Sequence, residues 1–396
     1  MEQPEEFGEG FDSFSTDAIH TGVDPMQWSH RAVVPPITLA TTFQIAEPTR
    51  GARFYYSRGN NPNRSCLEEC LAALEGAKSA YCFASGMAAT MTATHLLTSG
   101  DNVLCSADVY GGVFRYFKYC AVKMGISTTF VDFLDLAKLE AALDCKPKMV
   151  WFEVVTNPTL KITDIEAVVA VVRKKVPDAL ICVDNTFLTP YLLRPLDLGV
   201  DIVMHSITKY MNGHSDVLMG SLATNDANIA QQIKFFQMAL GAVPSPFDCF
   251  MVQRGLKTLA IRLREHCSNA KVVAEYLENH PLIDKVLYPG LASHSQYGLA
   301  KRILRDNGGM VSFYVKGSGE QTKTFLKNLK IISLGFSLGG YESLAELPCT
   351  MTHSMMTDEA RDAIGITNTL VRLSVGLENP TDLSRDLDSA LKTAIL

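Results

Sequence analysis

Short apolar runs alternate with segments of helical spacing along the first half of this chain, and this alternation limits the folds open to it. The apolar runs, which we predict to be strands, cover residues 80–83, 102–105, 128–131, 148–152, 179–183 and 202–205. Segments with helical spacing lie between them, among them 87–97, 114–123 and 165–174. Strands separated by helices form parallel sheets with helices on both faces. The sequence therefore predicts an α/β fold with a mostly parallel sheet.

A change of pattern after residue 240 predicts a second, smaller unit. The chain has 396 residues, which suits one large α/β domain and a smaller one. A turn-rich segment, 241–246, precedes a long helix expected over 248–279 with a break near Gly255. Strands at 310–315, 331–334 and 371–375 and a closing helix at 383–394 follow. We predict an N-terminal arm over 1–60, a large domain over 61–260 and a C-terminal α+β domain over 261–396.

The first 60 residues are rich in Gly, Pro, Ser and Thr, and the pair Pro35 and Pro36 argues against a helix or a central strand there. Helical spacing begins only at 67–74 and ends near Gly76. An extended arm with little core of its own is expected to pack on another body. The sequence indicates a second subunit as that body.

Composition excludes several functional classes. The chain has a net charge of −6 and no blocks of basic residues, so we do not expect it to bind nucleic acid or an anionic membrane. The expected partner is a small-molecule substrate. No apolar stretch is long enough to span a bilayer, and the acidic start lacks the pattern of a signal peptide. Ten scattered cysteines are expected to be reduced, and Cys66 with Cys70 lacks the further ligands of a metal site. The sequence predicts a cytoplasmic protein without a bound metal.

Polar residues follow two of the predicted strands at the edge where ligands of parallel sheets bind. Asp184 ends the run 179–183, and Ser206, Thr208 and Lys209 follow the run 202–205. A lysine amine forms a Schiff base with an aldehyde, and two hydroxyl groups beside it suit a phosphate. Pyridoxal phosphate (PLP) carries both groups, and a carboxylate such as Asp184 would keep its ring nitrogen protonated. A solvated surface lysine at a strand end is the alternative.

Three further positions suit the same ligand. Gly86, in the segment Ala84-Ser85-Gly86, lies between a predicted strand and a predicted helix. Backbone N–H groups at such a helix N-terminus can bind a phosphate. The alternative is an ordinary turn between a strand and a helix. Tyr110, before a Gly pair, offers a ring for stacking or is a loop residue. Arg372 interrupts an apolar strand and suits a substrate carboxylate or a structural salt bridge. No Walker loop or dinucleotide-binding glycine motif competes with this interpretation.

Several ordered blocks match one known family. They are Tyr56-Ser57-Arg58, Asn61-Pro62-Asn63-Arg64, Ala84-Ser85-Gly86, Asp108-Val109-Tyr110-Gly111-Gly112, Thr156-Asn157-Pro158, Val183-Asp184-Asn185-Thr186-Phe187, Ser206-Ile207-Thr208-Lys209-Tyr210, Gly241-Ala242-Val243-Pro244-Ser245-Pro246 and Glu342-Ser343-Leu344-Ala345-Glu346-Leu347-Pro348. On these residues the chain closely resembles the cystathionine γ-lyase group of the PLP enzymes of cysteine and methionine metabolism. The resemblance runs from Ala18 to the C-terminus and implies the aminotransferase-like fold type I.

The resemblance implies a role for each site residue. Lys209 would carry PLP and shuttle protons, and Asp184 would pair with the ring nitrogen. Tyr110 would stack on the ring. The phosphate would be bound by Gly86, Met87, Ser206 and Thr208, and by Tyr56 and Arg58 of the neighbouring subunit. An arm that contributes residues to the active site of a neighbouring subunit implies an oligomer, and the resemblance implies a homotetramer, the usual oligomeric state of the family.

The substrate end of the site is where the chain departs from its group. The resemblance places the substrate carboxylate on Arg372 and Ser337, Asn157 near the cofactor hydroxyl, and Arg115 at the distal end of the substrate. Animal cystathionine γ-lyases usually carry acids where this chain has Tyr55 and Phe336. Bacterial cystathionine β-lyases carry aromatic residues there, and methionine γ-lyases carry apolar ones.

The implied activity is a carbon–sulfur cleavage. The resemblance implies that L-cystathionine is cleaved to L-cysteine, 2-oxobutyrate and ammonia. Cystathionine β-lyase or methionine γ-lyase activity is the nearest alternative, because the two aromatic residues change the distal pocket. A catalytically altered scaffold protein that keeps the oligomer is a further alternative.

Overall fold

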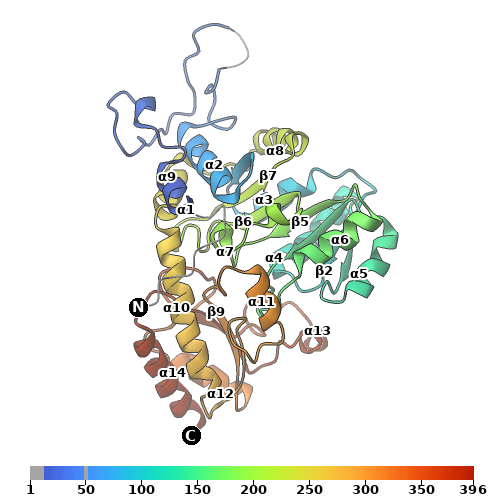
Figure 1. The fold of residues 1–396 in the computed structure, drawn as a ribbon, viewed down its shortest axis with the longest axis vertical. Helices are drawn as coiled ribbons and strands as arrows, with labels where there is room; N and C mark the ends of the chain where they lie inside the picture. The colour runs from blue at the N-terminus through green and yellow to red at the C-terminus, as the bar shows by residue number, and fades with distance from the viewer. Residues whose placement is uncertain (1–12, 49–51) are drawn as a thin grey trace.

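The computed structural model describes residues 13–48 and 52–396 of the chain. Figure 1 shows a large sheet flanked by helices and a second, smaller sheet packed beside the long helix α10 (Leu259–Glu278). The large sheet is mostly parallel and the protein is an α/β protein, as the sequence predicts.

The large sheet contains the strands that carry the predicted site residues. Its strands are β1 (Ser79–Phe83), β2 (Asn102–Ser106), β3 (Ser127–Val131), β4 (Met149–Glu153), β5 (Leu180–Asp184), β6 (Ile202–Ser206) and β7 (Gly220–Thr224), in the order β1-β7-β6-β5-β4-β2-β3. The five strands from β6 to β3 run parallel, and β7 is antiparallel to both of its neighbours. The carboxyl ends of β4, β5 and β6 therefore meet at one edge, where the site residues lie.

Both faces of this sheet are covered, which explains why its strands are continuous apolar runs. On β4, Val150 and Phe152 pack in one core, and Met149 and Trp151 pack in another on the opposite face. The first core includes residues of α2 (Pro62–Glu75), α5 (Leu136–Ala142), α6 (Ile165–Lys175), α7 (Thr189–Leu192) and α9 (Pro246–Leu256), and the second includes residues of α3 (Gly86–Thr94), α4 (Gly111–Arg115) and α8 (Ala227–Leu240).

The prediction of one continuous helix over residues 114–123 is wrong. Residues 114–123 are not one helix but the end of α4, a π-helical turn (Tyr116–Cys120) and a 3₁₀ turn (Ala121–Met124). Phe114 of α4 and Phe117 of the π turn both pack on the sheet, with ring centroids 4.8 Å from Phe130 and 5.6 Å from Trp151.

The second sheet and its helices form a separate core. Its strands are β8 (Ile283–Leu287), β9 (Met310–Val315), β10 (Ser333–Leu334), β11 (Leu344–Glu346) and β12 (Leu370–Ser374), in the order β10-β11-β12-β9-β8. Around it lie α10, α11 (Tyr297–Ile303), α12 (Gly319–Asn328), α13 (Asp358–Ala363) and α14 (Pro380–Ile395). The predicted helix break near Gly255 is confirmed, because α9 ends at Leu256 and α10 begins at Leu259.

The N-terminal segment includes a helix that the sequence did not predict. Helix α1 (Phe14–His20) buries Phe14 and Ala18 in the large core, beside α2. The chain from there to α2 has one short 3₁₀ turn (Pro25–Gln27) and leaves apolar side chains exposed, such as Val33 and Leu39. In the part of the chain that the structure describes, no helix has both the length and the apolar character that a membrane crossing requires. The domain boundaries near 60 and 260 stay predictions.

Candidate active site

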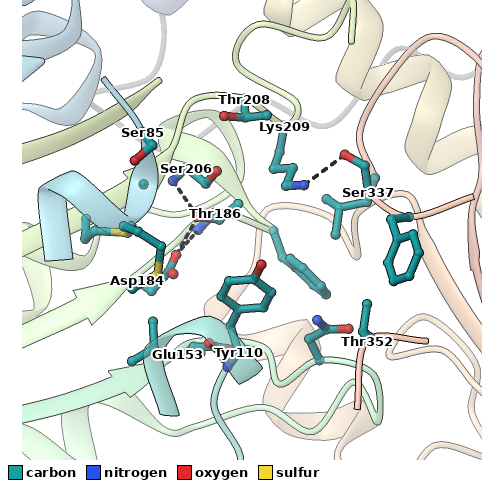
Figure 2. A pocket seen from close by; sticks show the side chains of 18 of the residues that line it. Ser85, Tyr110, Glu153, Asp184, Thr186, Ser206, Thr208, Lys209, Ser337 and Thr352 are labelled. Atoms are coloured by element: carbon teal, nitrogen blue, oxygen red, sulfur yellow. Dashed lines mark hydrogen bonds between the residues drawn. The ribbon is translucent and has the colours of Figure 1, made fainter. Parts of the chain in front are cut away.

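A cavity of about 380 Å³ opens where the carboxyl edge of the large sheet meets the small sheet. Figure 2 shows side chains pointing into it from the large sheet and the turns after its strands, and from loops beside the small sheet, among them Ser337 and Thr352. The predicted site residues that line it are Gly86, Met87, Tyr110, Asn157, Asp184, Ser206, Thr208, Lys209, Phe336, Ser337 and Arg372. Residues nearly 300 positions apart in sequence are thus brought to one place.

Lys209 lies in the turn after β6 with its amine facing the cavity (Figure 2). Its Nζ donates a hydrogen bond of 2.8 Å to Ser337 Oγ, across the junction of the two sheets. Burial lowers the pKa of the Lys209 amine to about 8; the positive charge of Arg372 adds to this effect and the carboxylate of Glu346 opposes it. A pKa of about 8 leaves about one fifth of the Lys209 amine neutral at pH 7.4, against about one thousandth at the ordinary lysine pKa. The neutral form is the one that acts as a nucleophile or proton acceptor.

This lowered pKa gives a prediction about chemical reactivity. In the PLP-free protein, acetylation of Lys209 by acetic anhydride should have a pH midpoint near 8, because the amine is protonated and unreactive below that pH and free above it. Mass spectrometry of the Lys209 peptide, referenced to exposed lysines of the same digest, measures the midpoint. Replacing Arg372 by Leu should raise the midpoint, since a neighbouring positive charge is removed. A midpoint near 10.4, the ordinary lysine value, would contradict the assignment.

Two carboxyl groups lie side by side beneath the cavity on neighbouring strands. Glu153 of β4 is opposite Asp184 of β5 in the sheet register, and burial raises the pKa of both. Asp184 Oδ1 accepts hydrogen bonds from the backbone N and the Oγ1 of Thr186, at 2.9 and 2.5 Å, which favour its ionised form. Glu153 has the charge of Asp184 beside it and accepts one bond, 2.5 Å from Tyr110 N. Of the two, Glu153 holds the proton and Asp184 holds the negative charge.

The turn before α3 provides a place for a phosphate. Ser85 is the N-cap of this helix and accepts a 3.1 Å bond from Ala88 N, so the first N–H groups of the helix point toward the cavity. A Cβ on Gly86 would lie 3.3 Å from Ser206 Oγ, so a larger residue would crowd this cradle. Thr208 Oγ1 exchanges hydrogen bonds with the backbone of Met219, and these bonds hold the residue before β7 against the turn after β6.

Arg372 is buried at the small-sheet side of the cavity. Its guanidinium donates to Asn157 Oδ1 at 2.9 Å and to Ser337 O at 2.7 Å, and it pairs with Glu346 at 3.1 Å. The salt bridge that the sequence left as an alternative is therefore present. Arg372 Nε has no hydrogen-bond partner among the residues that the structure describes, so one donor of the fork is left for an anion.

Four predicted residues do not line this cavity. Tyr55, Tyr56 and Arg58 are exposed on the segment before α2, and Arg115 is exposed at the end of α4. Arg58 instead lies near α8, with Nη1 3.5 Å from Met238 O. Their roles toward a ligand stay predictions, and the predicted roles of Tyr56 and Arg58 would require a second subunit.

The sequence interpretation missed four polar residues at the site: Glu153, Thr186, Glu346 and Thr352. Thr186 and Glu346 lie in the segments 183–187 and 342–348 that carry the family resemblance, but the resemblance assigned them no role. Glu153 is a single acid at the carboxyl end of an apolar strand, which is the signal that could have revealed it. Thr352, which donates a 2.8 Å bond to Glu346 Oε1, follows no apolar pattern and gave no signal.

Comparison with known proteins places this geometry in a family. The model of the family described as Cys/Met metabolism PLP-dependent enzyme matches residues 15–392. The chain belongs to that family. Cystathionine γ-lyase of Homo sapiens is 53% identical over 384 residues, covering 97% of this chain and 95% of its own, and that of Dictyostelium discoideum is 48% identical over 99% of both.

Solved structures of the family agree with the fold. The structure of cystathionine γ-lyase from yeast has a TM-score of 0.92 and 43% identity, over 99% of this chain and 100% of its own. That of cystathionine γ-synthase from Xanthomonas oryzae pv. oryzae, in complex with cystathionine, has a TM-score of 0.92 and 41% identity, over 96% and 98%. The predicted family resemblance is confirmed.

Enzymes of this family depend on PLP, and so does this chain. The cavity fits that cofactor: it offers an amine of lowered pKa, a buried carboxylate, a helix N-terminus with a glycine cradle and an aromatic ring, from Lys209, Asp184, Gly86 and Tyr110. Across residues 13–48 and 52–396, no group of three or more His, Cys, Asp and Glu side chains is arranged to hold a metal ion.

Proposed function

We propose that this chain is a carbon–sulfur lyase that converts L-cystathionine and water to L-cysteine, 2-oxobutyrate and ammonia. The relatives named cystathionine γ-lyase, about half identical over nearly the whole chain, support this substrate. The observation that carries the proposal is the pairing, in one cavity, of Lys209 with a buried Arg372 that has a free donor. Release of 2-oxobutyrate from L-cystathionine by the purified protein tests it, and release of pyruvate instead would favour the β-lyase alternative.

PLP, when bound, withdraws electrons from the Cα of an amino-acid substrate. In the proposed site Asp184 holds the negative charge that pairs with the ring nitrogen, and Thr186 keeps that carboxylate ionised. Tyr110 would stack on the ring, and Glu153 accepts a hydrogen bond that fixes the Tyr110 backbone. Gly86, Met87, Ser206 and Thr208 line the cavity and would bind the phosphate. Together these residues would orient the cofactor toward the substrate, and Asp184 would stay ionised while protons are transferred at the substrate.

Lys209 moves the protons. Its neutral amine would take a proton from the substrate Cα and release it again. In γ-cleavage the neutral amine would then take a second proton from Cβ and give it to the sulfur, which departs from Cγ as a thiol. Ser337 Oγ, 2.8 Å from Nζ, orients the amine. Arg372 binds the substrate α-carboxylate, with Ser337 and Asn157 beside it. The substrate is thereby held with its Cα toward Lys209.

Phe336 and Tyr55 are proposed to set the preference for the distal end of the substrate. Phe336 lies at the cavity with 61% of its surface exposed, and Tyr55 lies on the arm segment that reaches a neighbour. In Tyr55→Glu/Phe336→Glu we expect kcat/KM for cystathionine, relative to methionine, to rise about tenfold, because the acids pair with the distal ammonium. Aromatic rings give that ammonium only a partial substitute, through cation–π contact.

The control for this variant is Tyr297→Glu, which places an acid on α11, away from the cavity-lining residues. We expect it to leave the ratio unchanged. A ratio that is also unchanged in the double variant would show that the two aromatic positions do not select the distal group. Arg115 would then be the remaining candidate at that end.

We also infer that the protein is a cytoplasmic homotetramer with shared sites. All ten cysteines are free thiols, which suits a reducing compartment. Exposed apolar residues of the segment before α2, among them Met26, Val33 and Leu39, provide a surface for a second copy. Tyr56 and Arg58 lie on the same segment, outside this chain's own cavity, and are proposed to reach the phosphate in a neighbour.

A mixing experiment tests the shared site. Arg58→Ala and Lys209→Ala should each be inactive, but a 1:1 mixture under subunit exchange should recover activity at about one quarter of the wild-type sites, since half of the dimers are hybrids with one intact site each. Activity and retained PLP are measured before and after exchange. No recovery, with exchange demonstrated by mass labelling, would refute the shared site.

A further inference from the structure

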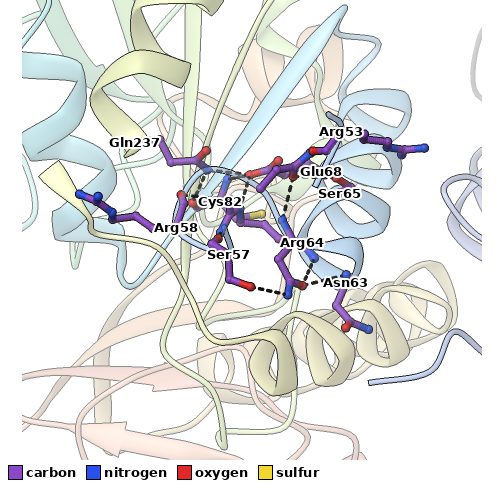
Figure 3. Close-up of polar contacts among 11 residues, drawn as sticks. Arg53, Ser57, Arg58, Asn63, Arg64, Ser65, Glu68, Cys82 and Gln237 are labelled. Carbon is purple, nitrogen blue, oxygen red and sulfur yellow. Dashed lines mark hydrogen bonds and ion pairs between the residues drawn. The ribbon is translucent and has the colours of Figure 1, made fainter. Parts of the chain in front are cut away.

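A buried arginine holds the segment that carries Tyr56 and Arg58. The side chain of Arg64, on the first turns of α2, is only 2% exposed. Its Nη1 donates to Ser57 O at 2.8 Å and its Nη2 donates to Arg58 O at 3.3 Å (Figure 3). The buried guanidinium of Arg64 thus binds two consecutive backbone carbonyls and fixes the backbone at Arg58, the residue that is proposed to reach the neighbour's phosphate.

A second buried contact fixes Arg64 itself. Glu68, one helical turn further along α2, pairs with Arg64 Nε at 3.6 Å. Its Oε1 also accepts bonds from Cys82 N at 2.9 Å and from Gln237 Nε2 at 2.7 Å, so it is tied to β1 and α8 (Figure 3). Burial raises the pKa of the Glu68 carboxyl, and the Arg64 charge opposes that rise. Arg64 is therefore held in place by the sheet and cannot follow the arm if the arm moves.

Another arginine shows what is special about this contact. Arg53 also joins the arm to α2, through Glu69 at 2.8 Å, but both side chains are about half exposed, at 54% and 47%. Exposed ion pairs contribute little because water screens them and both side chains lose freedom. Among the residues that the structure describes, Arg53 donates its side-chain hydrogen bond to Glu69 and to no carbonyl of the Tyr56–Arg58 segment, so it is a matched control for Arg64.

We propose that Arg64 is a positioning residue that presents Arg58 to the cofactor phosphate of the neighbouring subunit. The inference rests on the shared site proposed above and adds a residue that touches neither cofactor nor substrate. Arg64 contacts the arm directly, whereas its connection to its own phosphate turn, at Ser85 and Gly86, is indirect and runs through Glu68 and Cys82. Its loss should therefore weaken the neighbour's site and leave the site of its own chain intact.

The test uses Arg64→Met, which keeps the length of the side chain and removes its donors, and Arg64→Lys, which keeps the charge and loses the fork. We expect Arg64→Met to weaken PLP binding about tenfold or more, measured as the cofactor retained on dialysis, and Arg64→Lys to weaken it less. Arg53→Met should match wild type. The melting temperature of each PLP-free protein and its oligomeric state identify a variant that fails to fold, in which case Arg64→Lys carries the test.

Subunit exchange then shows in which site the defect lies. Arg64→Met mixed with Lys209→Ala should recover both retained PLP and activity to the level of the Arg58→Ala mixture, because the hybrid combines an intact Lys209 with an intact arm. If the Arg58→Ala mixture recovers and the Arg64→Met mixture does not, Arg64 acts within its own chain and the inference is wrong. If neither recovers despite exchange, the shared site itself is refuted, and the inference falls with it.

Discussion

Replacing Lys209 by Ala should lower kcat by about 10⁴-fold or more and remove the covalent attachment of PLP. Lys209 faces the cavity, and its amine has a pKa of about 8, so it supplies both the bond to the cofactor and the proton transfer. The two losses come from one atom and should appear together. Turnover is measured by oxo-acid release, and attachment by borohydride reduction followed by mass spectrometry of the Lys209 peptide.

Lys174→Ala is the control, because Lys174 is an exposed lysine of α6 with 80% of its side chain accessible. It should keep full activity and the same reduced adduct on Lys209. A Lys209→Ala protein that still gave a reducible adduct at the wild-type level would show that another amine carries the cofactor. Added ethylamine should restore part of the activity of Lys209→Ala if the defect is chemical rather than structural.

Replacing Asp184 by Asn should lower kcat about 100-fold. A nearby carboxylate raises the pKa of a cationic ring nitrogen by about one to three units, and Asn removes that charge. Asn keeps an oxygen in the place of Oδ1, which accepts both bonds from Thr186, so the turn should persist. The absorption spectrum of the bound cofactor should change together with kcat.

Glu153→Gln is the matched variant on the neighbouring strand. Glu153 holds the proton of the pair, and a neutral amide still accepts the bond from Tyr110 N, so this variant should lose less than tenfold in kcat. Equal losses in Asp184→Asn and Glu153→Gln would contradict the assignment of the charge to Asp184. Unchanged melting temperatures are required of both variants.

The sequence predicted most of the large sheet because its strands are buried on both faces. The runs that became β4 and β5 are apolar at every position up to the polar residue that ends them. Strand β7 (Gly220–Thr224) was not predicted, because only Leu222 and Ala223 among its five residues are apolar and the strand therefore contains no apolar run, although it is buried along its whole length. Helix α1 was missed because only Phe14 and Ala18 anchor it, through contacts with elements far along the chain.

The site was predictable where its residues follow strands in sequence. Asp184 ends β5 and Lys209 lies in the turn after the neighbouring strand β6, so the parallel sheet brings them together. The hydrogen bond from Lys209 to Ser337, and the pair of Arg372 with Glu346, depend on how the two sheets pack, and no local pattern encodes that packing. The same holds for the buried bonds from Arg64 to the arm, which join a helix to a loop of irregular form.

Products of cystathionine labelled with ¹³C in its four-carbon half test the proposed cleavage most directly. The purified protein, supplied with PLP, is incubated with this substrate, and the products are identified by NMR. Cleavage at Cγ by Lys209 and its neighbours predicts labelled 2-oxobutyrate, unlabelled cysteine and ammonia in equal amounts. Labelled homocysteine with unlabelled pyruvate would show that the bond to Cβ of the three-carbon half breaks instead, and would contradict the proposed γ-lyase activity.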